Sequence, residues 1–426
     1  MNLSVRELAE QARVAQRAVA ALDADGRRRL IWAMADELSV GRGAVLAANV
    51  EDMARAEAAG TRGAMLDRLR LDDGRIDGIV SALREIAAQD DPVGAVTRQQ
   101  TLPNGLLVER QRLPLGLIAM IYEARPNVTA DAAALCIKAG NAVLLRGGSE
   151  ARSSNAAIAA CLHAALRAND LPEAAVSVIT DPAREHVLEL LQLSDLIDLA
   201  IPRGGESLIR FVAENARVPV IKHYKGVCHL YVDRAADAGK ALELLVDGKT
   251  SRPGVCNALE TLLVHIDRVD DLLPQLVEML AAHGVTIHGC ERSRTRLPDI
   301  EAIEEVGFDR EYLDLEVSLK LVDSLEEALA HIVKHGSDHT EVIVTEDAGA
   351  ADNFVRGVRS SAVMVNASSR FNDGGQLGLG AEIGISTTRL HAYGPMGAES
   401  LTIERFVVRG EGQVRHPESR QARGDR

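Results

Sequence analysis

Strand-like and helix-like patterns alternate along most of this chain, and the alternation limits its fold more than any other feature. Short runs rich in Val, Ile and Leu are separated by amphipathic segments between residues 116 and 201, and again between 229 and 366. A regular succession of strand, helix and strand is typical of a parallel sheet. The sequence therefore predicts an α/β fold with two parallel-sheet domains.

The periodicity also predicts the position of each element. In the first series we expect strands at 116–122, 142–146, 176–179 and 196–201, with helices at 130–139, 153–167 and 184–191. In the second we expect strands at 229–233, 261–264, 285–288, 317–322, 341–344 and 362–366, with helices at 272–282, 325–334 and 348–357. Residues 4 to 90 indicate amphipathic helices. A Pro-Asn-Gly turn inside 97–112 predicts a hairpin.

Composition excludes several classes of protein. The 426 residues suffice for two or three domains, and a chain that is 46% hydrophobic but only 3% aromatic must fill its cores with aliphatic side chains. A net charge of −14 argues against nucleic-acid binding. The N-terminus is acidic and no apolar run reaches about 18 residues, so we expect a cytoplasmic protein without a membrane span.

The cysteines indicate free thiols, one of them a candidate nucleophile, and not a set of disulfide bonds. The chain has five, at 136, 161, 228, 256 and 290, with no C-x-x-C pair, which suits a reducing compartment. Cys256 lies in a small-residue turn, Lys249-Thr-Ser-Arg-Pro-Gly-Val-Cys256, that leads into an apolar strand. Positive charge from Lys249 and Arg252 would activate a thiolate there for attack on an acyl carbon. The local sequence is equally compatible with a small buried hydrophobic residue.

Four segments together resemble the aldehyde dehydrogenase superfamily and, within it, the γ-glutamyl phosphate reductases. The first two are Ile121-Tyr-Glu-Ala-Arg-Pro-Asn127 with its flanking residues 114–131, and the segment 139–151. The others are the cysteine segment and the segment 327–343. The resemblance covers nearly the whole chain. It implies NADPH-dependent reduction of L-glutamyl 5-phosphate to L-glutamate 5-semialdehyde through a thioester on Cys256, the second step of proline synthesis from glutamate.

The resemblance also implies a cofactor site for NADP(H). Arg146 stands at the end of a predicted strand, where the superfamily has a lysine, and Ser149 and Glu150 follow it. An arginine there can bind a phosphate with a fork of N–H groups. The turn Gly204-Gly-Glu-Ser207 matches the superfamily's pyrophosphate turn, with Gly204, Gly205, Glu206 and Ser207 as the expected contacts. Glu311 matches the residue that holds the nicotinamide ribose.

Two further positions concern catalysis. Asn127 lies near the superfamily's oxyanion-hole asparagine, with a shorter spacing to Gly140 than typical relatives have. Oxidising members carry a glutamate about 33 residues before the nucleophile to activate water, and this chain has His223 there, between Lys222 and Lys225. The missing base argues against a hydrolytic aldehyde dehydrogenase, and the basic residues suit a phosphoryl group. A catalytically silent scaffold is the remaining alternative.

The histidines at 331, 335 and 339 recur every fourth residue, but Gly336 should end the helix before the third, so no metal is expected. A role for His335 or His339 near the active site stays open.

The resemblance implies a division of the chain. Residues 1–96 and 113–225 would form the NADP(H)-binding domain, 226–398 the catalytic domain, 97–112 and 399–412 an oligomerisation arm, and 413–426 a flexible tail. The strand predicted at 402–409 and the hairpin would meet a neighbouring subunit, which implies a homo-oligomer. The sequence leaves open whether a glutamate 5-kinase hands over the unstable acyl phosphate.

Overall fold

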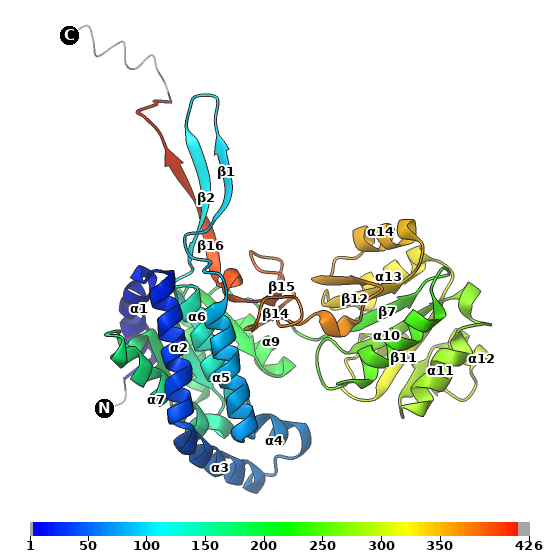
Figure 1. Cartoon of the computed structure of the whole chain (residues 1–426). Helices are drawn as coiled ribbons and strands as arrows, with labels where there is room; N and C mark the ends of the chain where they lie inside the picture. The colour runs from blue at the N-terminus through cyan, green and yellow to red at the C-terminus, as the bar shows by residue number, and fades with distance from the viewer. Residues whose placement is uncertain (1–2, 182, 416–426) are drawn as a thin grey trace.

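Two parallel sheets, one in each of two lobes, form the framework of the computed structural model (Figure 1). The structure describes residues 3–181 and 183–415. Of the predicted tail at 413–426, residues 416–426 lie outside this part of the chain. The α/β fold with two parallel-sheet domains is confirmed.

The first lobe is built on a four-stranded sheet of order β5-β4-β3-β6, with all pairs parallel. Its strands are β3 (Leu117–Tyr122), β4 (Ala142–Gly147), β5 (Val176–Val178) and β6 (Leu199–Arg203). Every residue of β3 is buried, because helices cover both faces of the sheet. One face packs on α2 (Ala24–Val40), α5 (Asp73–Ala88), α6 (Asn127–Lys138) and α7 (Arg152–Ala168), and the other on α1 (Val5–Ala21), α8 (Arg184–Gln192) and α9 (Glu206–Asn215).

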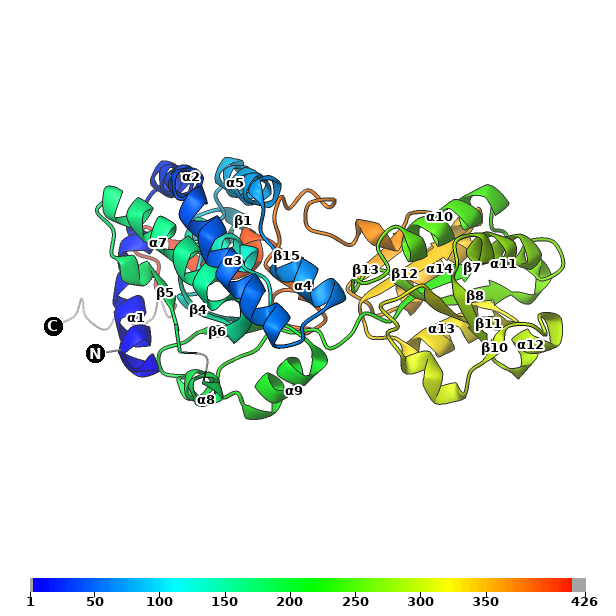
Figure 2. The same cartoon turned by 90° about the horizontal axis from the view of Figure 1, so that it is seen from below.

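The N-terminal helices begin at side-chain caps that the sequence provides. Ser4 and Glu7 form a capping box at α1, and Asp23 and Asp72 accept backbone N–H groups at α2 and α5. The remaining helices of this region, α3 (Arg42–Ala58) and α4 (Gly63–Leu69), reach the edge of the lobe that faces the second lobe (Figure 2).

The second lobe contains a seven-stranded sheet of order β10-β9-β11-β8-β7-β12-β13. Its strands are β7 (Cys228–Val232), β8 (Leu259–His265), β9 (Thr286–Gly289), β10 (Glu301–Ala302), β11 (Glu316–Val322), β12 (Thr340–Val344) and β13 (Ala362–Val365). The helices are α10 (Ala238–Thr250), α11 (Leu273–Ala282), α12 (Glu291–Arg296), α13 (Leu325–His335) and α14 (Ala348–Gly357). Separate apolar cores form under α10 with α11 and under α13 with α14.

Three features differ from the sequence predictions. Strand β6 runs over Leu199–Arg203 and not 196–201, because 193–197 forms a turn closed by the bond from Ile197 N to Leu193 O. Helices α10 and α12 were not predicted. The predicted boundary at 398 is too late, since Ile383, Ala392 and Met396 join the apolar core of the first lobe. The chain therefore returns to that lobe before 383, and β14 (Gly384–Ser386) pairs there with β15 (Gly394–Met396).

A three-stranded antiparallel arm projects from the first lobe (Figure 1). The predicted hairpin is confirmed as β1 (Val96–Thr101) and β2 (Leu107–Pro114), and the late strand β16 (Thr402–Arg409) pairs with β2. Gly105 turns the hairpin with a φ of 84°. Within the described ranges, no helix is both long and apolar enough to cross a membrane.

The fully buried side chain of Asn141 joins the arm to the sheet. Its Oδ1 accepts a hydrogen bond from Gly116 N at 2.7 Å, and its Nδ2 donates to Leu401 O at 2.9 Å. One amide thus satisfies buried backbone groups at the start of β3 and just before β16.

Replacing Asn141 by Ala should leave both backbone groups without a partner and lower the free energy of unfolding by roughly 2–4 kcal/mol. Urea unfolding measures this change. The matched control is Asn353→Ala on the exposed surface of α14, which should change stability by less than about 0.5 kcal/mol. Equal effects of the two substitutions would contradict this role of Asn141.

Candidate active site between the two sheets

The residues predicted for the cofactor and for catalysis lie on two sheet edges at the junction of the lobes. Arg146, Ser149 and Gly204 stand at or just after the carboxyl ends of β4 and β6, at one edge of the first sheet. Cys256 lies three residues before β8, at the amino-terminal edge of the second sheet. The chain crosses between the lobes as a green segment before β7 and returns as an orange segment after β13 (Figure 2).

A buried ion pair fixes both ends of the loop that carries Cys256. Lys249 in the last turn of α10 and Glu260 in β8 have no exposed side-chain area, and Lys249 Nζ lies 3.1 Å from Glu260 Oε2. Glu260 also accepts bonds from Tyr312 N at 3.2 Å and Leu313 N at 3.4 Å. Burial lowers the pKa of Lys249 and raises the pKa of Glu260 to about 7, while the partner charge opposes each shift. The prediction that Lys249 activates Cys256 is wrong, because its ammonium group faces Glu260.

The crossing segment passes directly against the backbone of Cys256. A Cβ placed on Gly226 would lie 1.9 Å from the carbonyl oxygen of Cys256, so only glycine fits. Gly226 N donates to Glu311 Oε1 at 2.9 Å, and Val227 N donates to Ser337 Oγ at 2.9 Å. Glu311, predicted to hold a ribose, therefore lies beside the nucleophile loop, and burial raises the pKa of its carboxyl group.

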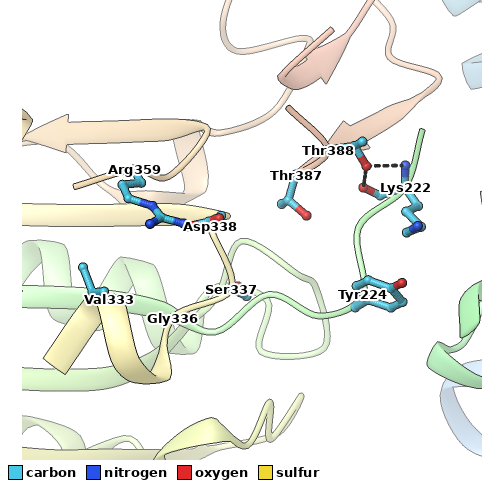
Figure 3. A pocket seen from close by; sticks show the side chains of 9 residues that line it. All are labelled: Lys222, Tyr224, Val333, Gly336, Ser337, Asp338, Arg359, Thr387 and Thr388. Carbon is cyan, nitrogen blue, oxygen red and sulfur yellow. Dashed lines mark hydrogen bonds between the residues drawn. The ribbon is translucent and has the colours of Figure 1, made fainter. Parts of the chain in front are cut away.

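The two crossing segments are bonded to each other. Lys222 N donates to Thr388 Oγ1 at 3.1 Å, and Thr387 N donates to Lys222 O at 3.2 Å. Beside this contact lies a polar crevice of about 340 Å³, which Tyr224 and Ser337 also line (Figure 3). The ammonium group of Lys222 lies 5.3 Å from the ring centre of Tyr224. Lys222 thus belongs to the junction between the lobes.

His223, at the position where oxidising relatives carry a glutamate, and its neighbour Lys225 both contact residues of the second lobe. The ring of His223 meets the ring of His339 edge-on at 5.8 Å, and Lys225 Nζ donates to the carbonyl of Asp309. Burial lowers the pKa of His339 to about 4, so this ring is neutral at physiological pH. His335 is bonded to the carboxylates of Asp309 and Glu305 at 2.8 Å and 3.0 Å.

The Gly204-Gly205 turn already holds an anionic oxygen. Gly205 N donates to Glu123 Oε2 at 2.9 Å, and a Cβ on Gly204 would lie 2.3 Å from that oxygen. A turn at the start of α9 whose N–H group binds a carboxylate oxygen can bind a phosphate oxygen of a dinucleotide in the same way. Ser207 is exposed beside it, whereas Glu206 Oε1 accepts a bond from Arg210 Nη2 at 2.6 Å.

The residues after β4 lie at the same sheet edge. Arg146 is buried at the end of the strand, and burial lowers its pKa while Glu150 opposes the shift. Ser149 and Glu150 form a short 3₁₀ turn. Glu150 Oε1 accepts a bond from Ala124 N at 2.6 Å, which supports the left-handed backbone of Ala124, where φ is 40°.

Asn127 begins α6, and its Nδ2 donates to Asp131 Oδ2 at 2.9 Å. Asp131 is half-buried, and desolvation raises its pKa to about 6. Asp131 fixes the orientation of the Asn127 amide and occupies one of its N–H groups. The oxyanion role of Asn127 stays a prediction.

The sequence prediction gave no role to Arg125, although it quoted the segment that contains it. Burial lowers the pKa of Arg125 to about 10, the charges of Arg203, Arg68 and Arg252 lower it further, and the thiolate of Cys256 opposes the shift. Arg68 Nη2 also donates to Gly254 O across the junction at 3.3 Å. Arg125 thus lies within electrostatic reach both of Cys256 and of three other arginines. The available signal was the position of Arg125 and Arg203 at the ends of predicted neighbouring strands.

Comparison with known proteins agrees with this arrangement. The sequence profile of the Aldehyde dehydrogenase family matches residues 2–291. The chain is 60% identical over 414 residues to a gamma-glutamyl phosphate reductase of Xanthomonas axonopodis pv. citri, an alignment that covers 97% of this chain and 100% of the relative. The chain belongs to the γ-glutamyl phosphate reductases of the aldehyde dehydrogenase family.

Solved structures support the same assignment. The crystal structure of gamma-glutamyl phosphate reductase from Thermotoga maritima is 43% identical with a TM-score of 0.95, covering 97% of this chain and 100% of that one. An engineered glycolyl-CoA reductase with bound NADP+ shares the fold at 16% identity and a TM-score of 0.68, covering 95% and 96%. Like the γ-glutamyl phosphate reductases it resembles, the chain is an oxidoreductase.

Replacing Gly226 by Ala should force the crossing segment away from the Cys256 loop, because the clash involves backbone and no side-chain rotation relieves it. We expect a loss of about 1–3 kcal/mol in unfolding free energy and an altered rate of Cys256 alkylation by iodoacetamide. Peptide mass spectrometry follows the alkylation. The control is Gly78→Ala in α5, where nothing lies within 4 Å of the added Cβ. Indistinguishable results for the two variants would refute the close contact.

Proposed function

We propose that this chain reduces L-glutamyl 5-phosphate to L-glutamate 5-semialdehyde with NADPH and releases inorganic phosphate, the second step of proline biosynthesis from glutamate. The observation that carries the proposal is the position of Cys256, half-buried beside the crossing segment in a loop that Arg68 of the first lobe contacts through Gly254 O. The names of the relatives at 60% and 43% identity support the substrate.

In the first step, the thiolate of Cys256 attacks the acyl carbon. A carbon–sulfur bond forms, the carbon–oxygen bond to the phosphoryl group breaks, and its electron pair leaves with the phosphate. Backbone N–H of Cys256 and the amide of Asn127 would stabilise the oxyanion that forms on the way. Because phosphate is a good leaving group, the thioester forms without an activated water.

The cofactor would occupy the edge of the first sheet. Arg146, Ser149 and Glu150 would contact the adenosine end, the segment 204–207 the pyrophosphate, and Glu311 the nicotinamide ribose. Arg146 supports the choice of NADPH over NADH, since an arginine can bind a 2′-phosphate. Glu123 would have to release Gly205 N for a phosphate oxygen. NADPH supplies the hydride that reduces the thioester to the aldehyde.

The position of His223 supports reduction over hydrolysis. In oxidising relatives a carboxylate at this position activates water, whereas here a histidine packs edge-on against His339. Without the carboxylate that activates water in those relatives, the thioester would survive until hydride arrives.

The reverse reaction tests the proposal directly. Semialdehyde and NADP+ should yield NADPH only when inorganic phosphate is present, and Cys256→Ala should abolish this signal, measured by absorbance. Cys290→Ala is the matched control, since Cys290 is another half-buried free cysteine and should keep wild-type rates. Equal rates with and without phosphate would instead identify a hydrolytic aldehyde dehydrogenase.

The proposal includes a homo-oligomer assembled through the arm. All residues of β1 are exposed, and β16 presents Phe406 and Val408 with 66% and 55% of their surface exposed. An open strand edge with apolar side chains is a surface that proteins ordinarily cover.

Replacing Phe406 and Val408 together by Asp should reduce the particle mass toward the 45.7 kDa of one chain, because charge replaces the apolar surface. Light scattering after size exclusion measures the mass. Val40→Asp at the end of α2 is the control, since Val40 is 82% exposed but lies off the arm. A wild-type protein with the mass of one chain would refute the assembly.

A further inference from the structure

Arg125 and Arg203 emerge side by side at the junction of the lobes. Arg203 ends β6 and pairs in register with Tyr122, the last residue of β3, and Glu123 N donates to Arg203 O at 3.1 Å. Arg125 follows three residues after Tyr122. Both side chains are half-buried. The neighbouring ends of two parallel strands thus carry two arginines at one edge of the first sheet, and Arg125 lies within electrostatic reach of Cys256.

Neither guanidinium has a carboxylate partner within residues 3–181 and 183–415. Among the residues that the structure describes, no ion pair or side-chain hydrogen bond joins Arg125 or Arg203 to another residue, although Asp131 lies within electrostatic reach of Arg203. Other arginines with little exposed surface are paired with carboxylates, for example Arg27 with Asp91 at 2.6 Å. A chain of net charge −14 has acidic groups in excess. Two half-buried arginines without a carboxylate partner can therefore bind an anionic ligand.

Two further arginines extend the positive field around the nucleophile. Arg252 lies in the Cys256 loop itself, and Arg68 reaches that loop through the carbonyl of Gly254 at 3.3 Å. Both are exposed, so they form the solvent side of the cluster. The basic residues that the sequence indicated for a phosphoryl group point elsewhere, since Lys225 Nζ is bonded to Asp309 O and Lys222 lines the crevice beside Tyr224.

We infer that Arg125 and Arg203, aided by Arg252 and Arg68, form the subsite that binds the phosphoryl group of the substrate next to Cys256. This inference rests on the proposed function and adds the residues that bind the leaving group. Arginine suits the task, because its planar fork binds two phosphate oxygens at once. As the carbon–oxygen bond breaks, the electron pair moves onto phosphate oxygen, and the guanidinium groups stabilise the growing negative charge.

The most direct test compares an anionic and a neutral alkylating reagent at Cys256. For each protein we compare the rate of Cys256 alkylation by iodoacetate with the rate by iodoacetamide. This ratio should be roughly tenfold lower in Arg125→Gln than in the wild type, because one cationic contact to the anionic reagent is lost. Inorganic phosphate should protect Cys256 in the wild type but not in Arg125→Gln. Peptide mass spectrometry separates Cys256 from the other cysteines. Arg125→Lys should keep part of both effects.

The control is Arg234→Gln. Arg234 is exposed after the carboxyl end of β7, on the opposite edge of the parallel sheet from Cys256, and its loss should leave ratio and protection unchanged. Melting temperatures within about 2 °C of wild type would show that the variants fold. If Arg125→Gln does not fold, the alkylation ratio and the phosphate protection are measured in Arg203→Gln and Arg125→Lys instead.

The reverse reaction adds a readout that a structural role would not move. In Arg125→Gln the KM for inorganic phosphate should rise roughly 10- to 100-fold while the KM for NADP+ stays within about twofold. A shift confined to the KM for NADP+ would assign the arginines to the cofactor and overturn the inference. So would an unchanged alkylation ratio with no phosphate protection. Should the wild type fail to oxidise the semialdehyde, protection of Cys256 by phosphate would still support the subsite, and only the proposed substrate would fall.

Discussion

The close passage of Gly226 along the backbone of Cys256 is the constraint on which the rest of this structure depends. It joins the segment that leaves the first lobe to the loop that carries Cys256, with no room for a side chain between them. Glu311 and Ser337 hold this segment by bonds to Gly226 N and Val227 N. Cys256 is therefore positioned against the crossing segment by backbone contact, which is stiffer than contact through flexible side chains.

A second element keeps the nucleophile loop in place from the opposite side. The Lys249–Glu260 pair is fully buried, and such a pair rarely adds net stability, because desolvation offsets the attraction. The pair instead fixes the end of α10 to β8 across the loop. Glu260 also accepts a bond from the backbone N–H of Tyr312. The positive charge around Cys256 comes instead from the arginines of the first lobe and of the loop itself.

Local sequence patterns predicted most of the framework but little of the long-range pairing. Buried parallel strands such as β3 and β4 are continuous apolar runs, and the turn residues around Gly105 and Gly204 are local signals, so these features were predictable. The partner of Lys249 and the return of the chain to the first lobe before Ile383 depend on contacts between distant residues. Arg125 was missed although it follows the end of a predicted strand, because spacing alone does not show that it lacks a carboxylate partner among the described residues. Asn127 and the NADP(H) contacts stay predictions from resemblance.

The central claim is that Cys256 carries the acyl group covalently during turnover. Semialdehyde and NADP+ mixed with the enzyme without phosphate, then quenched in acid, should leave a glutamyl thioester on the peptide that contains Cys256, detected by mass spectrometry. Added phosphate should remove this adduct before the quench. An enzyme that turns over with phosphate yet never carries the adduct on Cys256, or carries it on another residue, would contradict the account.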